Sequence, residues 1–298
     1  TMDFTKYIRT DLAAESGAPT ADPKERKRHE GDGSLWECRP LCEGAELSSL
    51  TILNAEGAER FGRECGRYIT LSFGDIWLLG DEEKAALCRQ LTFQLLQLAQ
   101  ASAPNYRRVL VCGLGNRDLT TDAIGPLTVR SLQVNRHILP PDEPAPRVEL
   151  SAFCPGVLGQ TGIESADLIL AAVRHVRPDL VILLDALAAR DEARLARTVQ
   201  LSDTGLAPGS GIGNHRRPLN RDTLGVPVIA MGVPTVVSSA TLICGALEKA
   251  GLCEIPAALE QVLETGKSFF VSLKEADVAT SQIAELLASA LTSAFSAA

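Results

Sequence analysis

The sequence predicts an α/β fold, a three-layer α/β/α sandwich around a mainly parallel sheet that forms a single domain. Apolar runs such as LVILL at 180–184 alternate along the chain with segments of helical periodicity. Continuous apolar strands are typical of parallel sheets that are covered on both faces. Hydrophobic residues make up 45% of the 298 residues but aromatic residues only 4%, so small aliphatic side chains must fill the core.

The expected elements alternate along the chain. The segment 81–100 carries leucines at 87, 91, 95 and 98, the spacing of one helix face. Thr161 and Glu164 form a capping-box pattern that opens a helix to 176, and Pro178 follows it. The charged stretch 13–34 is expected to be an exposed, mobile segment. The strands are expected at 67–73, 108–112, 180–184, 198–201 and 227–231, and the other helices at 123–137, 256–265 and 275–296.

Composition excludes several classes of protein. The 37 acidic residues exceed the 29 Lys and Arg, and a net charge of −8 argues against direct nucleic-acid binding. No apolar stretch approaches the roughly 20 residues that span a bilayer, and residues 1–9 lack a signal-peptide core. The eight cysteines include no CxxC pair, which favours reduced, buried thiols over disulfides or a zinc site. We therefore expect a cytoplasmic protein without a metal or cofactor.

Two acidic residues follow apolar strands at positions where α/β proteins bind ligands. Asp122 lies in the turn GLGNRDLTTDAIGP after strand 108–112, and Asp185 directly follows strand 180–184. Both carboxylates can face one crevice if their strands are neighbours. Two such groups can share a proton, so that one activates a water and the other polarises a carbonyl. Each residue also has a simpler interpretation, because Asp is a preferred helix N-cap.

Other motifs carry weaker signals. Gly113 and Gly115 resemble half of a dinucleotide fingerprint, but Asp118 stands where its third glycine would be. The glycine-rich loop 202–217 lacks a phosphate-loop ending and is either a flexible loop or a wall of the site. The four histidines have no ligand spacing, and only His215 lies in that loop. The candidate residues of this loop for a substrate groove are Gly209, Ser210, Gly211 and Gly213.

Eight segments together resemble the spore germination proteases, the endopeptidases that degrade small acid-soluble spore proteins when a spore germinates. The segments follow one another in order along most of the chain, and the run QLSDTGLAPGSGIGN is the most specific of them. They are RTDLAAE at 9–15, GRYITL at 66–71, GLGN with TDAIGP at 113–126, PGVLGQTGIESADLI at 155–169, PDLVILLDALAAR at 178–190, QLSDTGLAPGSGIGN at 200–214, TLGVPVIAMGVPTVV at 223–237 and VSLKEADV at 271–278.

The resemblance implies an aspartic-type endopeptidase, unrelated in fold to pepsin, whose two essential aspartates fall on Asp122 and Asp185. It implies a fold similar to the hydrogenase maturation endopeptidases, in which acids at matching positions bind a metal. It also implies a homotetramer in the forespore and spore core, made as a zymogen that loses a short propeptide. Two departures from the family pattern, Thr121 and Ser238, affect the surroundings of the site but neither aspartate.

The family's substrates are cut after an acidic residue and before an apolar one, in a Thr-Glu-apolar-Ala context with a further acid downstream. The segment 10–15, TDLAAE, resembles an internal copy of that site. We therefore expect self-cleavage between Asp11 and Leu12, which divides the chain into a propeptide, 1–11, and a peptidase domain, 12–298. The alternative for this segment is an ordinary flexible tail.

Three functions are compatible with these observations. The first is the peptidase with a proton-sharing aspartate pair. The second is a metal-dependent endopeptidase in which Asp122 and Asp185 are ligands with His215 as a third. The third is a non-catalytic module that binds a nucleotide or a partner through the glycine-rich loop, against which the missing phosphate-binding signatures argue.

Overall fold

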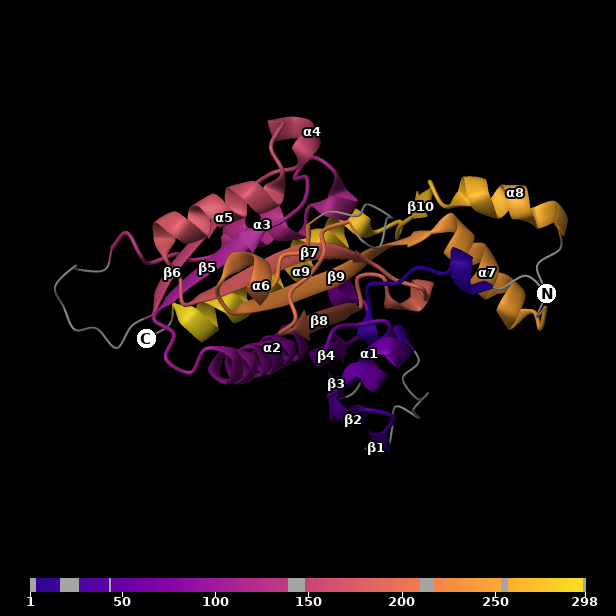
Figure 1. Cartoon of the computed structure of the whole chain (residues 1–298), viewed down its shortest axis with the longest axis horizontal. Coiled ribbons are helices and arrows are strands. Elements are labelled where there is room, and N and C mark those ends of the chain that lie inside the picture. Colours follow the sequence, from indigo (N-terminus) through magenta and orange to yellow (C-terminus); the bar gives the residue numbers. More distant parts are fainter. Residues whose placement is uncertain are drawn as a thin grey trace.

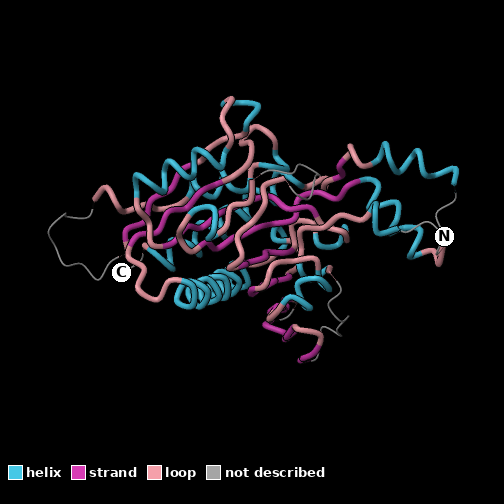
Figure 2. Tube along the Cα trace, in the orientation of Figure 1, coloured by secondary structure: helices cyan, strands magenta, loops and turns pink. Residues whose placement is uncertain are grey.

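The computed structural model confirms a single α/β domain, in which helices cover both faces of a central mixed sheet (Figures 1 and 2). It describes residues 4–16, 27–42, 44–138, 148–209, 217–252 and 257–296. The strand order is β1-β2-β3-β4-β8-β9-β7-β5-β6, and β10 pairs with β9. The strands are β1 (Lys27–Gly31), β2 (Ser34–Cys42), β3 (Ala45–Ile52), β4 (Gly66–Ser72), β5 (Arg108–Gly113), β6 (Glu149–Phe153), β7 (Leu180–Ala188), β8 (Thr198–Ser202), β9 (Val228–Ser238) and β10 (Phe270–Val271).

The sheet has a parallel part and an antiparallel part. The strands β6, β5, β7 and β9 run parallel to one another, and the other neighbouring strands pair antiparallel. The antiparallel part was not predicted from the sequence beyond β4 and β8. In β3, buried and half-buried positions alternate only in part, which gives a weaker signal than the apolar runs of the parallel part.

Helices lie on both faces of the sheet. One face packs α2, α3 and α9 against side chains such as Val109, Ile182 and Met231. The opposite face packs α5 and α6 over Leu110, Val181 and Leu183, and α1 over the antiparallel part. The α-helices are α1 (Ala55–Phe61), α2 (Asp81–Ser102), α3 (Ile124–Ser131), α4 (Leu158–Thr161), α5 (Ser165–Val176), α6 (Arg221–Leu224), α7 (Ser239–Lys249), α8 (Ala257–Gly266) and α9 (Ala276–Phe295).

Short 3₁₀ turns complete the structure, and two of them carry residues of interest below. The turns are η1 (Phe4–Tyr7), η2 (Ala13–Glu15), η3 (Ile76–Leu78), η4 (Thr120–Asp122) and η5 (Glu192–Arg194). In Figure 1 the N-terminal segment, drawn in indigo, runs from the end of the molecule that carries α7 and α8 toward the sheet. Among the described helices, none is both long enough and apolar enough to cross a bilayer.

Three local predictions were wrong. The helix expected at 123–137 ends at Ser131, and residues 132–137 are not helical. Helix α5 begins after Glu164 rather than at Thr161, because α4 ends at Thr161 and a left-handed Gly162 separates the two helices. The Thr161 hydroxyl accepts a hydrogen bond from the Ile163 amide instead of capping α5. The stretch 13–34 is also not uniformly exposed, because Ala13 is fully buried and β1 forms a sheet strand. For 17–26 the expectation lies outside the described residues.

We predict that Asp179 stabilises the start of the parallel part through its charge. Burial raises the pKa of its carboxyl, but hydrogen bonds from the Arg107 and Arg108 amides, at 2.9 and 2.8 Å, and the Arg108 guanidinium outweigh this and lower the pKa. A lowered folded-state pKa gives stability that is present at neutral pH and lost as the pH falls through it. Asp179→Asn should therefore reduce the free energy of unfolding at pH 7 by about 1 kcal/mol, after discounting for solvent screening.

Urea denaturation at several pH values measures this effect. The difference between wild type and variant should narrow as the pH is lowered from 7 toward 3. Glu59→Gln, at an exposed position of α1, is the control. A difference that stays constant with pH would show that the Asp179 charge contributes nothing.

Candidate active site

The main cavity lies on the face of the sheet that also carries α1, α5 and α6, and has a volume of about 500 Å³. Because side chains alternate between the two faces of a strand, every second residue of the central strands reaches it. The strand residues that line it in this way are Tyr68 of β4, Gln200 and Ser202 of β8, Ala230 and Gly232 of β9, and Asp185 and Leu187 of β7. Toward the ends of β7 and β9, Ala186, Ala188, Thr235 and Val236 line it as well. Their chain neighbours, such as Leu201 and Met231, pack in the core on the opposite face.

Asp185 is a buried acid within a strand. Its side chain lines the cavity with 8% of the residue exposed, and its Oδ1 accepts a hydrogen bond from the Ala186 amide at 3.0 Å. Strand β7 continues to Ala188, four residues beyond the predicted end. The N-cap alternative for Asp185 is therefore wrong, since no helix begins there.

Asp122 reaches the same cavity from η4, the turn after β5. Its Oδ2 accepts a hydrogen bond from the Asn116 amide at 2.8 Å, and the Thr235 hydroxyl donates to the Thr121 carbonyl at 2.6 Å. Helix α3 begins later than predicted, with Ala123 as its N-cap and no side-chain cap. The N-cap alternative for Asp122 is thus wrong as well, and its carboxylate is held by the loop that follows β5.

Gly115 allows this loop to fold back on Asp122. Its φ of +106° lies in a region that side chains disfavour, and a Cβ there would lie 2.0 Å from the Asp122 carbonyl oxygen. The half-fingerprint of glycines after β5 therefore has a local structural role, which is to let the backbone of Asp122 approach.

The two acids come together because β5 and β7 are adjacent and parallel. Gly113 pairs with Leu184, and the Leu114 amide donates to the Leu184 carbonyl at 2.8 Å. The prediction that both carboxylates face one crevice depended on these strands being neighbours, and the structure confirms that they are. A cavity with two carboxylates on a partly apolar wall suits acid–base chemistry on an uncharged group such as a peptide bond.

The N-terminal segment is docked against this cavity. Asp11 lines it, with the Asp11 amide donating to the Ala188 carbonyl and the Ala188 amide donating to Asp11 Oδ2, both at 2.8 Å. Leu12 is fully buried in a cluster with Leu195 and Val237. The described part of this segment is therefore not a flexible tail, which makes that alternative wrong.

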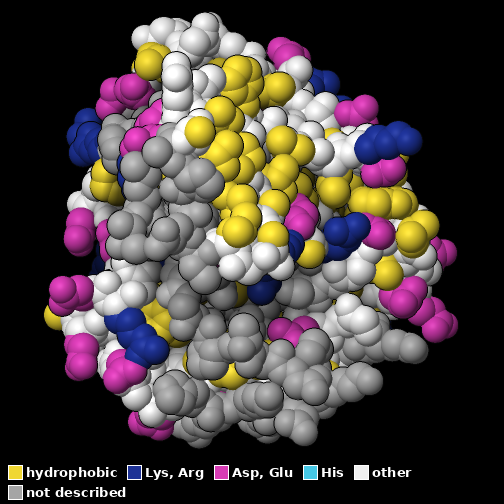
Figure 3. Space-filling model, turned by 90° about the vertical axis from the view of Figure 1, so that its right-hand side faces the viewer, with side chains coloured by type: hydrophobic (Ala, Val, Ile, Leu, Met, Phe, Trp, Pro, Cys, Tyr) yellow, Lys and Arg dark blue, Asp and Glu magenta, His cyan; other side chains and the backbone are white. Residues whose placement is uncertain are grey.

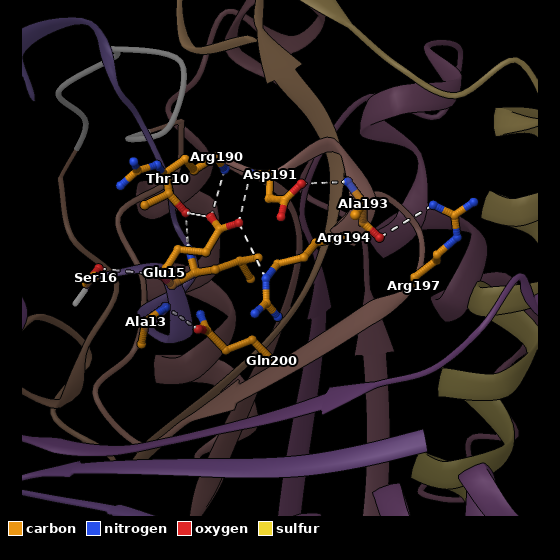
Figure 4. Close-up of polar contacts among 11 residues, drawn as sticks. Thr10, Ala13, Glu15, Ser16, Arg190, Asp191, Ala193, Arg194, Arg197 and Gln200 are labelled. Atoms are coloured by element: carbon orange, nitrogen blue, oxygen red, sulfur yellow. Dashed lines mark hydrogen bonds and ion pairs between the residues drawn. The ribbon is translucent and has the colours of Figure 1, made fainter. Parts of the chain in front are cut away.

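The bond between Asp11 and Leu12 is held from both sides by Gln200. The Gln200 Nε2 donates to the Asp11 carbonyl at 3.1 Å, and its Oε1 accepts from the Ala13 amide at 2.7 Å. Figure 4 shows Gln200 beneath the segment, with Ala13 and Glu15 above it. Nothing in the sequence marked Gln200, because a single glutamine in a strand has no distinguishing pattern.

Arg63 is a second residue that the sequence did not indicate. It lines the cavity, and its guanidinium donates to the Thr10 carbonyl at 2.9 Å and to the Ser16 hydroxyl at 3.3 Å. Burial lowers the pKa of Arg63, and the negative charge of Asp11 opposes this effect. Arg63 thus places a positive charge next to the acidic residue of the docked segment.

The remaining candidates contribute less. Gly209 lines the cavity, whereas Ser210, Gly211, Gly213 and His215 lie outside the described residues. Burial raises the pKa of Cys112 and of Cys154, so neither thiol is a thiolate nucleophile at neutral pH. Within the described ranges no group of three or more His, Cys, Asp and Glu side chains could hold a metal ion.

Comparison with known proteins finds sequence relatives over most of the chain. The family model described as germination protease matches residues 15–250. Germination proteases of Clostridium perfringens and Bacillus subtilis are 42% and 40% identical over 248 and 247 residues, each 81% of this chain and 74% and 66% of those proteins. The [NiFe] hydrogenase maturation protease HycI of Thermococcus kodakarensis aligns over 67% of this chain and 99% of its own, with 17% identity and a TM-score of 0.37.

We predict that Gly115→Ala disturbs Asp122. The strained φ and the contact with the Asp122 carbonyl should together lower the free energy of unfolding by about 3 kcal/mol. Urea denaturation measures this loss. Gly245→Ala is the matched control, since its added Cβ meets no atom within 4 Å and its helix α7 favours alanine. Equal stability of the two variants would contradict the role given to Gly115.

Proposed function

The chain belongs to the germination protease family, and on this premise we propose that it is an aspartic-type endopeptidase that begins the degradation of small acid-soluble spore proteins during germination. It cuts after an acidic residue and before an apolar one, with Asp122 and Asp185 as the catalytic pair. One observation carries this proposal: the peptide bond between Asp11 and Leu12 is docked at the cavity that both aspartates line. The proposed place of action is the cytoplasm of the forespore and the spore core.

In the proposed mechanism the two carboxyl groups share one proton. The ionised group takes a proton from a water whose oxygen attacks the carbonyl carbon of the acidic residue, while the protonated group donates a hydrogen bond to the carbonyl oxygen. The tetrahedral intermediate collapses as the C–N bond breaks, and the leaving amine takes up a proton. Gln200 supports this step, because its Nε2 donates to the carbonyl oxygen of Asp11 and can stabilise the developing negative charge.

We also propose that the chain is a zymogen that processes itself at this bond. The propeptide is 1–11 and the peptidase domain 12–298. Support comes from the contacts that fix the bond on either side: Arg63 on the Thr10 carbonyl, Gln200 on the Asp11 carbonyl, and Gln200 again on the Ala13 amide. The loop 202–217, which includes Gly209, is proposed to form a wall of the substrate groove.

A homotetramer is the proposed assembly. The region around α8 and β10 exposes apolar side chains, and Figure 3 shows hydrophobic side chains gathered on this end of the molecule. Exposed apolar clusters are typical of surfaces that other chains cover. The exposed residues of this region are Val262, Phe269, Phe270 and Val271.

Asp122→Asn and Asp185→Asn test the catalytic pair. Each variant should lose at least about 100-fold in kcat/KM on a spore-protein substrate, because a positioned acid–base group typically contributes 10²- to 10⁴-fold. Gel analysis and mass spectrometry of the digest measure this loss. The control is Asp81→Asn, at an exposed position in the first turn of α2, which does not line the cavity. If either variant at 122 or 185 still digests the substrate, the pair is not the catalytic machinery.

Chelation separates this mechanism from the metal-dependent alternative. Activity should survive exhaustive treatment with a chelator, and elemental analysis of the active protein should find no stoichiometric metal. Loss of activity that a divalent metal restores would favour the second mechanism instead.

The cleavage position is tested by incubating the full chain at mildly acidic pH and sequencing its N-terminus. We expect a new terminus at Leu12, and Asp11→Ala should slow its appearance because the Ala188 amide then loses its carboxylate partner. An N-terminus that stays at Thr1, or a new one elsewhere, would overturn the proposed site.

The assembly is tested by placing charges on the apolar region. The double variant Val262→Asp and Phe269→Asp should shift the mass in solution from tetramer toward smaller species, measured by light scattering after size exclusion. Leu78→Asp, at an exposed apolar residue of η3, should leave the mass unchanged. A wild-type chain that is monomeric would refute the tetramer.

A further inference from the structure

The side chain of Glu15 is buried in a socket built for a carboxylate. Its exposed fraction is only 5%, yet an ionised acid is costly to remove from water unless hydrogen bonds replace its hydration. The Arg190 amide donates to Oε2 at 2.7 Å and the Asp191 amide to Oε1 at 2.9 Å. The Arg194 Nε lies 3.5 Å from Oε1, and the Thr10 hydroxyl donates to Oε2 (Figure 4).

The socket belongs to the same structural unit as the catalytic strand. Arg190 and Asp191 follow β7, which carries Asp185, after one intervening residue, and Arg194 ends η5 three residues after Asp191. Backbone amides have positions fixed by the fold, so the socket does not depend on Glu15 for its shape. The fold therefore fixes the position of the socket relative to the catalytic cavity, and with it the number of peptide residues that lie between the two.

The resemblance already implies an acid downstream of the cut; we propose that the Arg190 and Asp191 amides and the Arg194 guanidinium are the groups that recognise this acid, at the fourth position after the cleaved bond. In the structure Glu15 fills the socket, four residues after Asp11 and three after Leu12. This inference rests on the proposed cleavage between Asp11 and Leu12, and it assigns a recognition role to Arg194.

A second consequence concerns the chain itself. Glu15 lies on the part of the chain that remains after cleavage, so the new N-terminus keeps the group that fills the socket. A substrate with an acid at the same position must displace it. Residues 12–15 of the processed chain are therefore a tethered competitor of the substrate.

Peptide binding tests the socket without requiring cleavage. The probes are a fluorescent peptide with the sequence of residues 6–17 and the same peptide with Glu15→Gln. The protein is the full chain with Asp185→Asn, to block cleavage, and Glu15→Gln, to weaken its own segment. The Glu peptide should bind about tenfold more tightly than the Gln peptide, because hydrogen bonds to a charged group are stronger than those to a neutral one.

Arg194→Gln in this protein should reduce the preference to about twofold while leaving binding of the Gln peptide nearly unchanged, which also shows that the variant is folded. Arg194→Lys should restore part of the preference. Lys249→Gln is the control for the loss of one positive charge. Lys249 pairs with Glu192, which lies in η5 together with Arg194, and not with Glu15. Equal binding of the two peptides, or a preference that survives Arg194→Gln undiminished, would overturn the subsite.

The tethered competitor is tested by restoring Glu15. The chain with Asp185→Asn alone should bind the Glu peptide at least about tenfold more weakly than the chain that also has Glu15→Gln. Equal affinities would overturn this consequence. Failure of the proposed cleavage has a different signature: the Glu peptide then binds with the expected preference, but the wild-type chain does not cut it.

Discussion

The parallel pairing of β5 with β7 is the constraint on which the site depends. It places the turn after β5 against the middle of β7, so that Asp122 and Asp185 line one cavity although 62 residues separate them in the sequence. The remaining parts of the site are positioned relative to this pair. Gly115 lets the turn close on Asp122, and the pairing of β7 with β9 brings Gly232 beside Asp185.

The antiparallel half of the sheet has a different role. It supplies residues that contact the docked segment rather than those that would cut it. Gln200 of β8 forms hydrogen bonds with the segment, and Tyr68 of β4 packs in one cluster with Ala13. Arg63, between α1 and β4, contacts the same docked segment. The cavity thus lies where the parallel unit that carries both acids meets the antiparallel unit that carries Gln200, and the docked N-terminal segment contacts both units.

The sequence indicated the parallel part well, and the antiparallel part poorly. Strands such as 180–184 are wholly apolar because both faces are covered, and such runs are easy to recognise. The strands β1–β3 mix polar and apolar residues, so they were missed. The positions of Asp122 and Asp185 followed from the rule that ligands bind at strand ends. Gln200, Arg63 and Arg194 could not be predicted, because their partners belong to an N-terminal segment that is far away in the sequence.

The anchoring of the segment before the predicted cut has a consequence for timing. Tyr7 is fully buried among Ala240, Cys244 and Leu263, and its carbonyl accepts a hydrogen bond from the Thr241 hydroxyl at 3.0 Å. A cut after Asp11 would sever the chain without loosening this anchor. The cleaved N-terminal peptide would remain bound to α7 and α8 through Tyr7, and it would leave only by dissociation into the surrounding solution. Hydrolysis of the peptide bond and release of the cleaved peptide are then two separate events. The release depends on dilution of the peptide and not on the hydrolysis step.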